Sequence, residues 1–122
     1  MNKMVEQVKE FHEKFGVPKA VSPADIYEPG VLLMRARLII EEASEFMEGA
    51  SRLNAELMAD ALGDLLYVTI GAAEALDFNI DAIFNEIHAS NMSKSLGVKE
   101  EDGKIQKGPS YFPPRIRKVM YS

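Results

Sequence analysis

The sequence contains no cysteine and no tryptophan, and its only two histidines are His12 and His88. The lack of cysteine excludes disulfide bonds, thiolate nucleophiles, zinc ribbons and iron–sulfur clusters. Two histidines are too few for a three-histidine zinc site within one chain. These absences leave open a site in which carboxylate oxygens bind a hard cation.

Long hydrophobic runs are also missing. The longest uncharged apolar stretch covers residues 65–73, about half of the length that spans a membrane. Residues 1–14 carry charges throughout and lack the apolar segment of a secretory signal. A length of 122 residues is typical of one domain. We therefore expect a single cytoplasmic domain over residues 1–122 that does not bind membranes.

Positive charge is scarce in most of the chain. The formal net charge is −5, from 14 Lys and Arg against 19 Asp and Glu. Residues 1–93 hold 7 basic and 16 acidic residues, a net charge of −9, whereas residues 94–122 hold 7 and 3, a net charge of +4. A negative overall charge argues against generic binding to a nucleic acid polymer.

The hydrophobic pattern and the capping residues predict an all-α protein. Asn54 and Asn79 stand at positions typical of helix N-caps, and strand-like alternation is absent from the sequence. Beyond residue 92, glycines and prolines interrupt a basic arm. The predicted elements are helices at about 2–15, 31–50, 54–76 and 79–92, arranged like a four-helix bundle, and an extended arm at 93–122.

In the second predicted helix, an apolar stripe changes abruptly into an acidic one. The stripe is aliphatic up to Leu38. Glu42 and Glu45 continue it, and Glu41 lies at its edge. Either the helix leaves the core after Leu38, or its carboxylates point inward to a site.

The third predicted helix is apolar on nearly every side, which is typical of a buried central helix. Asp64 lies in its middle, and Asp60 lies one turn earlier on the same stripe. A buried carboxylate is costly unless it is paired or metal-bound, and residues 53–78 contain no Lys, Arg or His. Packed antiparallel, the two helices would collect four or five carboxylates, an arrangement that suits Mg²⁺ or Mn²⁺. A di-iron bundle would need Glu-x-x-His motifs, which the sequence lacks.

The fourth predicted helix ends in polar residues. Its apolar stripe runs from Ile80 through Phe84 to Ile87, and Asn91 and Lys94 continue it. These two side chains are either the solvated end of a frayed helix or contacts for phosphate and sugar. The basic arm that follows suits a polyphosphate whose oxygens are bridged by Mg²⁺.

Four segments in order resemble the all-α nucleoside triphosphate pyrophosphohydrolases, the MazG-like superfamily that includes phosphoribosyl-ATP pyrophosphohydrolase and the dimeric dUTPases. The segments are EEASE at 41–45, DALGDLLYVTIG at 60–71, HASNMSK at 88–94 and DGKIQKGPSYFPP at 102–114. The similarity extends over residues 4–114 and includes VKEFHEKFG at 8–16 and the pair Arg35 and Arg37. It implies a MazG-type all-α fold.

The family pattern E-E-x-x-E, followed by E-x-x-D on the next helix, implies roles for the carboxylates. Ala61 stands where the pattern has its second-helix glutamate, and the nearest acid is Asp60, which leaves the number of metal ions open. The implied cofactor is Mg²⁺, with Mn²⁺ as an alternative. The implied metal ligands are Glu42, Glu45, Asp60 and Asp64, and the implied catalytic base is Glu41.

The resemblance implies hydrolysis of a (deoxy)nucleoside triphosphate between its α- and β-phosphates, which yields a nucleoside monophosphate and pyrophosphate. The segments SNMSK and KGPSYFPP favour a dUTPase-like or general deoxynucleotide enzyme, for example one that sanitises the nucleotide pool. The resemblance also implies a homodimer or homotetramer. The alternative is a non-catalytic nucleotide-sensing or partner-binding helical module on the same scaffold. The implied substrate-binding residues are Asn91, Lys94, Lys107, Tyr111 and His12, of which the aromatic ones are also common in packing.

Overall fold

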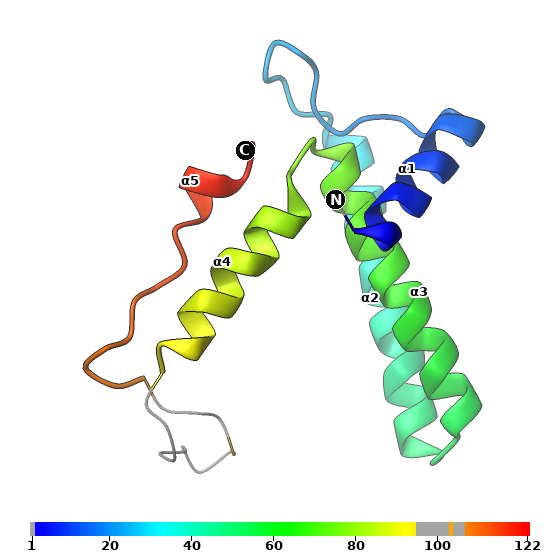
Figure 1. The fold of residues 1–122 in the computed structure, drawn as a ribbon. Helices are drawn as coiled ribbons and strands as arrows, with labels where there is room; N and C mark the ends of the chain where they lie inside the picture. Colours follow the sequence, from blue (N-terminus) through cyan, green and yellow to red (C-terminus); the bar gives the residue numbers. More distant parts are fainter. Residues whose placement is uncertain (1, 95–102, 104–106) are drawn as a thin grey trace. The chain divides into compact units, whose positions relative to one another are not determined.

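The computed structural model describes residues 2–94, 103 and 107–122, and within them it is built from α-helices (Figure 1). The only extended pairing in these residues is an isolated bridge between Val21 and Tyr27. The predicted all-α class and its four main helices are confirmed. The helices are α1 (Lys3–Phe15), α2 (Pro29–Ser51), α3 (Ala55–Ala75), α4 (Ile80–Met92) and α5 (Ile116–Val119).

The short helix α5 was not predicted, because four residues are too few to show a helical period. The parts of the predicted arm at 95–102 and 104–106 lie outside the described residues. In the part of the chain that is described, no helix has the length and apolar character needed to cross a membrane.

The chain forms two compact units. The first unit is Met1–Phe78 and contains α1, α2 and α3. The second unit is Asn79–Ser122 and contains α4 and α5. The expectation of a single domain over residues 1–122 stays a prediction.

Asparagine side chains begin three of the helices. Each accepts a hydrogen bond from the backbone N–H three residues later, at 2.9 Å for Asn2, 3.1 Å for Asn54 and 3.0 Å for Asn79. Such a cap stabilises a helix by about 1 kcal/mol. Gly16 ends α1 in the left-handed conformation, with a φ of 60°, which glycine adopts without steric cost. The predicted helix starts at Asn54 and Asn79 are therefore confirmed.

In the first unit, α2 and α3 form a closely packed antiparallel pair (Figure 1). A Cβ atom on Gly49 would lie 3.0 Å from the backbone nitrogen of Met58, and one on Gly71 would lie 2.8 Å from Nη1 of Arg35. Glycine at position 49 therefore lets the two helix backbones approach closely, and glycine at position 71 leaves room for the Arg35 side chain.

These two contacts establish the register of the α2–α3 pair. Successive facing positions are seven residues apart on each helix, which corresponds to two helical turns or about 10 Å. A residue two turns from either glycine therefore lies on the inner face of the pair. The facing residues, from one end of the pair to the other, are Gly49 and Leu57, Glu42 and Asp64, and Arg35 and Gly71.

The composition of α3 predicts burial on nearly every side, but the first unit by itself does not bury the helix in this way. Ala61 is fully buried, but Leu62 and Leu66 are 47% and 52% exposed, and Asp64 is exposed as well. Only one side of α3 packs in the first unit, mainly against α2. Composition alone could not show this, because an apolar helix face that is left uncovered has the same residues as a buried one.

In the second unit, the chain returns alongside α4 towards α5 (Figure 1). Backbone and side-chain nitrogens of Asn79 donate hydrogen bonds to carbonyl oxygens of Met120 and Ser122. The predicted apolar stripe of α4 does not face this packing, since Phe84 is 68% exposed. The buried side of α4 instead carries Glu86 and Ser90, so the expected direction of the stripe is wrong for this unit.

Candidate metal centre

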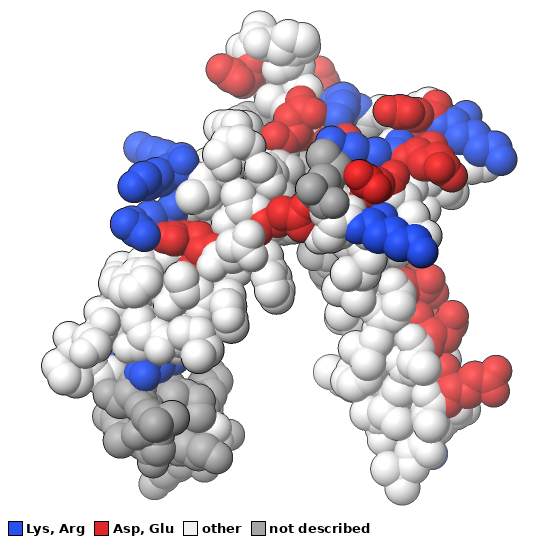
Figure 2. Space-filling model, viewed as in Figure 1, with Lys and Arg blue, Asp and Glu red and all other residues white. Residues whose placement is uncertain are grey.

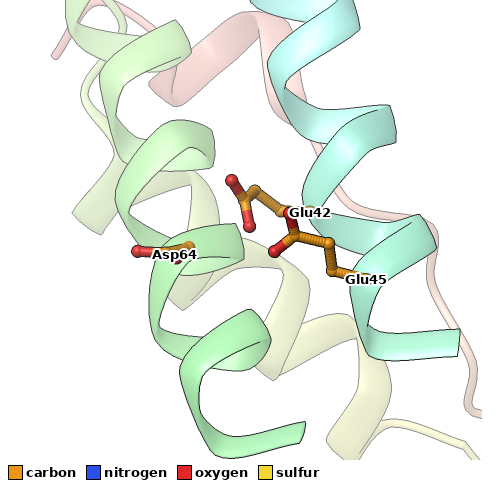
Figure 3. Close-up of side chains that lie close together, drawn as sticks. All are labelled: Glu42, Glu45 and Asp64. Atoms are coloured by element: carbon orange, nitrogen blue, oxygen red, sulfur yellow. The ribbon is translucent and has the colours of Figure 1, made fainter. Parts of the chain in front are cut away.

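Three carboxylates meet between α2 and α3. Glu42 and Glu45 extend from α2 towards α3, which carries Asp64 (Figure 3). One oxygen from each of these residues lies within 4.8 Å of the other two. The structure therefore brings together three of the four predicted metal ligands.

The cluster is electrostatically unfavourable without a cation. The Oε2 atom of Glu42 is buried and has no hydrogen-bond partner. Burial raises the pKa of Glu42, and the nearby carboxylates of Glu45, Asp64 and Asp60 raise it further. A bound divalent cation would remove both the repulsion and the unsatisfied oxygen.

The geometry fits a small, hard cation. Two oxygens bound to one Mg²⁺ ion are at most about 4.2 Å apart, because each lies about 2.1 Å from the metal. The carboxylate oxygens of the cluster, which lie within 4.8 Å of one another, would have to move closer by about half an ångström to reach this range. Because all three donors are carboxylates, the set favours Mg²⁺ or Mn²⁺ over Zn²⁺.

Two further predicted acids lie outside the three-oxygen cluster. Glu41 and Asp60 are exposed, and the only sign of proximity is the contribution of Asp60 to the raised pKa of Glu42. The register places Ala61, which is fully buried, opposite Glu45. The position that carries a glutamate in the family pattern is thus filled here by a small residue in the helix interface.

A buried cationic group lies two turns from the carboxylates. Arg35 is 8% exposed, and its Nη2 atom is 3.4 Å from Nε2 of His12. Burial lowers the pKa of His12, and the neighbouring Arg35 lowers it further. Gly71 provides the space for both side chains, because a Cβ atom there would lie 2.8 Å from the guanidinium and 3.3 Å from the imidazole. Arg35 was visible in the sequence, but its contact with α1 was not.

Exposed aromatic side chains lie beside the same inner face. The Phe11 ring packs edge-on against Tyr67, with ring centroids 5.7 Å apart, and tilted against Phe15 at 4.8 Å. Tyr67 is one turn from Asp64 on α3. All three rings are more than 40% exposed.

The other predicted substrate-binding residues belong to the second unit. Asn91 and Lys107 are exposed, and Lys94 and Tyr111 are half-buried. The Lys107 ammonium lies 5.1 Å from the centroid of the Tyr111 ring, in a cation–π arrangement. Basic side chains also gather at α5, whereas acidic side chains follow one edge of the α2–α3 pair (Figure 2).

Sequence reasoning missed Glu86 and Ser90, which are the buried polar residues of α4. The Nε atom of Arg115 donates a 2.8 Å hydrogen bond to Glu86, and the Ser90 hydroxyl donates one of 2.8 Å to the carbonyl of Phe112. The signal was their spacing of four residues, which places polar side chains on one helix face. Their partners lie more than 20 residues away and have no sequence signature.

The sequence is similar to those of known proteins. The sequence model of the phosphoribosyl-ATP pyrophosphohydrolase family matches residues 8–91. An uncharacterized protein of Acanthamoeba polyphaga mimivirus is 33% identical over 79 residues, which cover 62% of this chain. The chain spans about a third of the length of that relative, since the match covers 32% of it.

Proposed function

Because the chain belongs to the phosphoribosyl-ATP pyrophosphohydrolase family, we propose that it hydrolyses a nucleoside triphosphate between the α- and β-phosphates. Membership identifies the chain as a nucleotide pyrophosphohydrolase at the level of the family. The finer assignment is Mg²⁺-dependent hydrolysis of a deoxynucleoside triphosphate to a monophosphate and pyrophosphate. Nucleotide-pool sanitation, as in a dUTPase-like enzyme, is the role that fits this reaction.

The observation that carries the proposal is the cluster of Glu42, Glu45 and Asp64. Three carboxylate oxygens within 4.8 Å, one of them from a glutamate with a buried, unpartnered oxygen, support a divalent cation site. When bound, Mg²⁺ would neutralise charge on the phosphates and acidify a water molecule. Both effects would lower the barrier to hydrolysis of a phosphoric anhydride.

The residues around the cluster provide the remaining chemistry. Glu41 is the proposed base that accepts a proton from the attacking water, and its exposed carboxylate is free to turn towards substrate. Asp60 is the proposed additional carboxylate, in the place of a glutamate at Ala61. Exposed rings such as Tyr67 are suited to stack on a nucleobase, and His12 is the proposed contact to base or ribose.

The phosphates are proposed to contact Asn91, Lys94 and Lys107. An amide donates hydrogen bonds to phosphate oxygens, and ammonium groups stabilise the negative charge that develops on the leaving pyrophosphate. Tyr111, whose ring lies beside the Lys107 ammonium, is proposed to limit the directions that this long side chain can take.

The proposed assembly is a homodimer or a dimer of dimers. Exposed leucines on α3, Leu62 and Leu66, lie on one helix face, and Ile40 and Met47 of α2 are 64% and 73% exposed. Substituting glutamate at both Leu62 and Leu66 should shift the mass measured by light scattering towards the monomer. The matched control is Leu53→Glu, at an 87% exposed leucine in the turn between α2 and α3, which should leave the mass unchanged.

The experiment that tests the function is a panel of ribo- and deoxynucleoside triphosphates incubated with Mg²⁺. The expected products are a nucleoside monophosphate and pyrophosphate, separated by ion-exchange chromatography. Glu42→Gln should reduce the rate at least about a hundredfold, since it removes a ligand for the metal on which the transition state depends. The matched control is Glu48→Gln, because Glu48 lies on the same helix and pairs with Arg52 at the surface.

Other products would contradict the proposal. Release of orthophosphate in place of pyrophosphate would indicate cleavage at the terminal phosphate. Binding of nucleotide and Mg²⁺ without turnover of any nucleotide in the panel would identify the alternative, a non-catalytic nucleotide sensor.

A further inference from the structure

The most buried side chains of α4 are polar. Its buried residues are Glu86 and Ser90, at 8% and 2% exposure, whereas Phe84 is 68% exposed. Polar groups are buried at a free-energy cost unless they form hydrogen bonds. Here the hydrogen bonds come from the chain that returns along α4, residues 107–115, which we call the C-terminal strap.

Three side chains of α4 and its C-cap hold the strap. Glu86 accepts a 2.8 Å hydrogen bond from Arg115. Ser90 and Ser93 bind the same peptide segment: the Ser90 hydroxyl donates to the Phe112 carbonyl at 2.8 Å, and the Ser93 hydroxyl accepts from the Phe112 N–H at 3.1 Å. The anchors are four and three residues apart, so they form one row on the helix.

The anchored strap brings polar and cationic groups to the C-terminal end of α4. The Phe112 N–H donates a hydrogen bond to Ser93, the residue before Lys94. Asn91 lies one helical turn before Lys94. Tyr111 directly precedes Phe112, and its ring lies against the Lys107 ammonium. A backbone hydrogen bond from Tyr111 to the carbonyl of Gly108 shapes the turn between these two residues.

We propose that Glu86, Ser90 and Ser93 are positioning residues that hold the C-terminal strap against α4, so that Lys107 and Tyr111 form a preorganised phosphate-binding surface with Asn91 and Lys94. This inference rests on the proposed function, because the ligand is the phosphate chain of the nucleotide. The anchors act through the strap and contact no substrate. Because the strap is already ordered in the free protein, substrate binding does not have to offset the entropic cost of ordering it. The anchors therefore increase the affinity for the nucleotide.

The entropic cost of ordering the strap predicts how the kinetics change when an anchor is removed. Ordering even one backbone residue on binding weakens affinity by about tenfold. Glu86→Gln and Ser90→Ala should therefore raise KM for the triphosphate by about tenfold and leave kcat within about twofold. The requirement for Mg²⁺ should not change, because the carboxylates of the cluster are untouched.

The test combines steady-state kinetics with calorimetric binding of inorganic triphosphate in the presence of Mg²⁺. Weaker binding of triphosphate by both variants, with faster hydrogen exchange in residues 107–115, is the expected result. A reversed ion pair, with Glu86→Arg and Arg115→Glu together, should return KM towards the wild-type value. The matched control is Glu48→Gln, which breaks the exposed ion pair to Arg52 and should not alter KM.

Two outcomes would overturn the proposal. Faster exchange in the strap with unchanged KM and triphosphate affinity would show that the strap is ordered for reasons unrelated to phosphate. A fall in kcat that parallels a fall in melting temperature, without rescue by the reversed pair, would show a purely structural role. Binding of inorganic triphosphate is measured without turnover. If the wild type hydrolysed no nucleotide, the proposed function would be wrong, but the binding data would still show whether the C-terminal strap contributes to phosphate affinity.

Discussion

Each unit contains a partly buried glutamate, and the pKa values of these two glutamates are shifted in opposite directions. In the first unit, Glu42 lies among other carboxylates, and burial together with Glu45 and Asp64 raises its pKa. In the second unit, a hydrogen bond from Arg115 lowers the pKa of Glu86. A glutamate with its own cationic partner stabilises the chain around it, whereas one placed among like charges indicates a site for a cation from solution.

Adding Mg²⁺ should give the largest difference between the units. At about one hundred times its Kd, a ligand that binds only the folded state raises the free energy of unfolding by about 2.7 kcal/mol. Glu42→Gln should lose this increment, and Glu86→Gln should retain it. Urea unfolding with Mg²⁺ and with a chelator measures the effect, and an equal Mg²⁺ increment in wild type and Glu42→Gln would contradict the metal site.

The close packing of the first unit can be broken at Gly71. Gly71→Ala should lower the free energy of unfolding by about 1–3 kcal/mol, because its Cβ atom would lie 2.8 Å from the buried Arg35 side chain. Gly63→Ala is the matched control on the same helix, since a Cβ atom there has no neighbour within 4 Å. That substitution should instead stabilise the protein by about 0.8 kcal/mol through helix propensity. The same sign for both variants in urea unfolding would contradict the packing argument.

Without metal, substitutions of the two glutamates should change stability in opposite directions. Glu42→Gln should raise the melting temperature, because it removes a charge that its neighbours oppose. Glu86→Gln should lower it, because it removes the charge that binds Arg115. Calorimetry in the presence of a chelator measures both melting temperatures. Shifts of the same sign in the two variants would contradict the opposite roles assigned to Glu42 and Glu86.

The smallest expected effect is a loosening of the C-terminal strap in acid. Because the pKa of Glu86 in the folded protein is lowered from its ordinary value of 4.5, its contribution to stability is complete above pH 4.5. This contribution is lost as the pH falls through the lowered pKa. Hydrogen exchange in residues 107–115, corrected for the intrinsic pH dependence, should therefore accelerate below about pH 4.5 in the wild type. Glu86→Gln should show no such acceleration.

Much of the fold could be predicted from local chemistry. Asparagine caps act within one turn, so Asn54 and Asn79 marked helix starts in the sequence itself. The grouping of the carboxylates of Glu42, Glu45 and Asp64 was also predictable, because helical spacing determines which carboxylates share a face; their role as metal ligands stays a prediction.

The features of the fold that could not be predicted from the sequence depend on tertiary contacts. The direction of the α4 stripe depended on Glu86 and Ser90, whose partners are 29 and 22 residues away. The burial of Arg35 depended on the space left by Gly71, and a glycine inside a helix has several possible causes. Exposure of Asp64 could not be inferred, because an apolar helix gives no sign of which side its own unit leaves open.

Gly49 carries no ligating atom, but its lack of a side chain lets α2 and α3 approach closely near the carboxylate cluster. A Cβ atom on Gly49 would lie 3.0 Å from the backbone nitrogen of Met58, two helical turns from the level of Glu42 and Asp64. Mg²⁺ requires oxygens at about 2.1 Å, whereas Ca²⁺ accepts about 2.3–2.6 Å and more of them. For the proposed cation site, we expect a larger residue at position 49 to separate the helices and to shift the preference towards Ca²⁺, so that selectivity would depend on backbone spacing at a position remote from the ion.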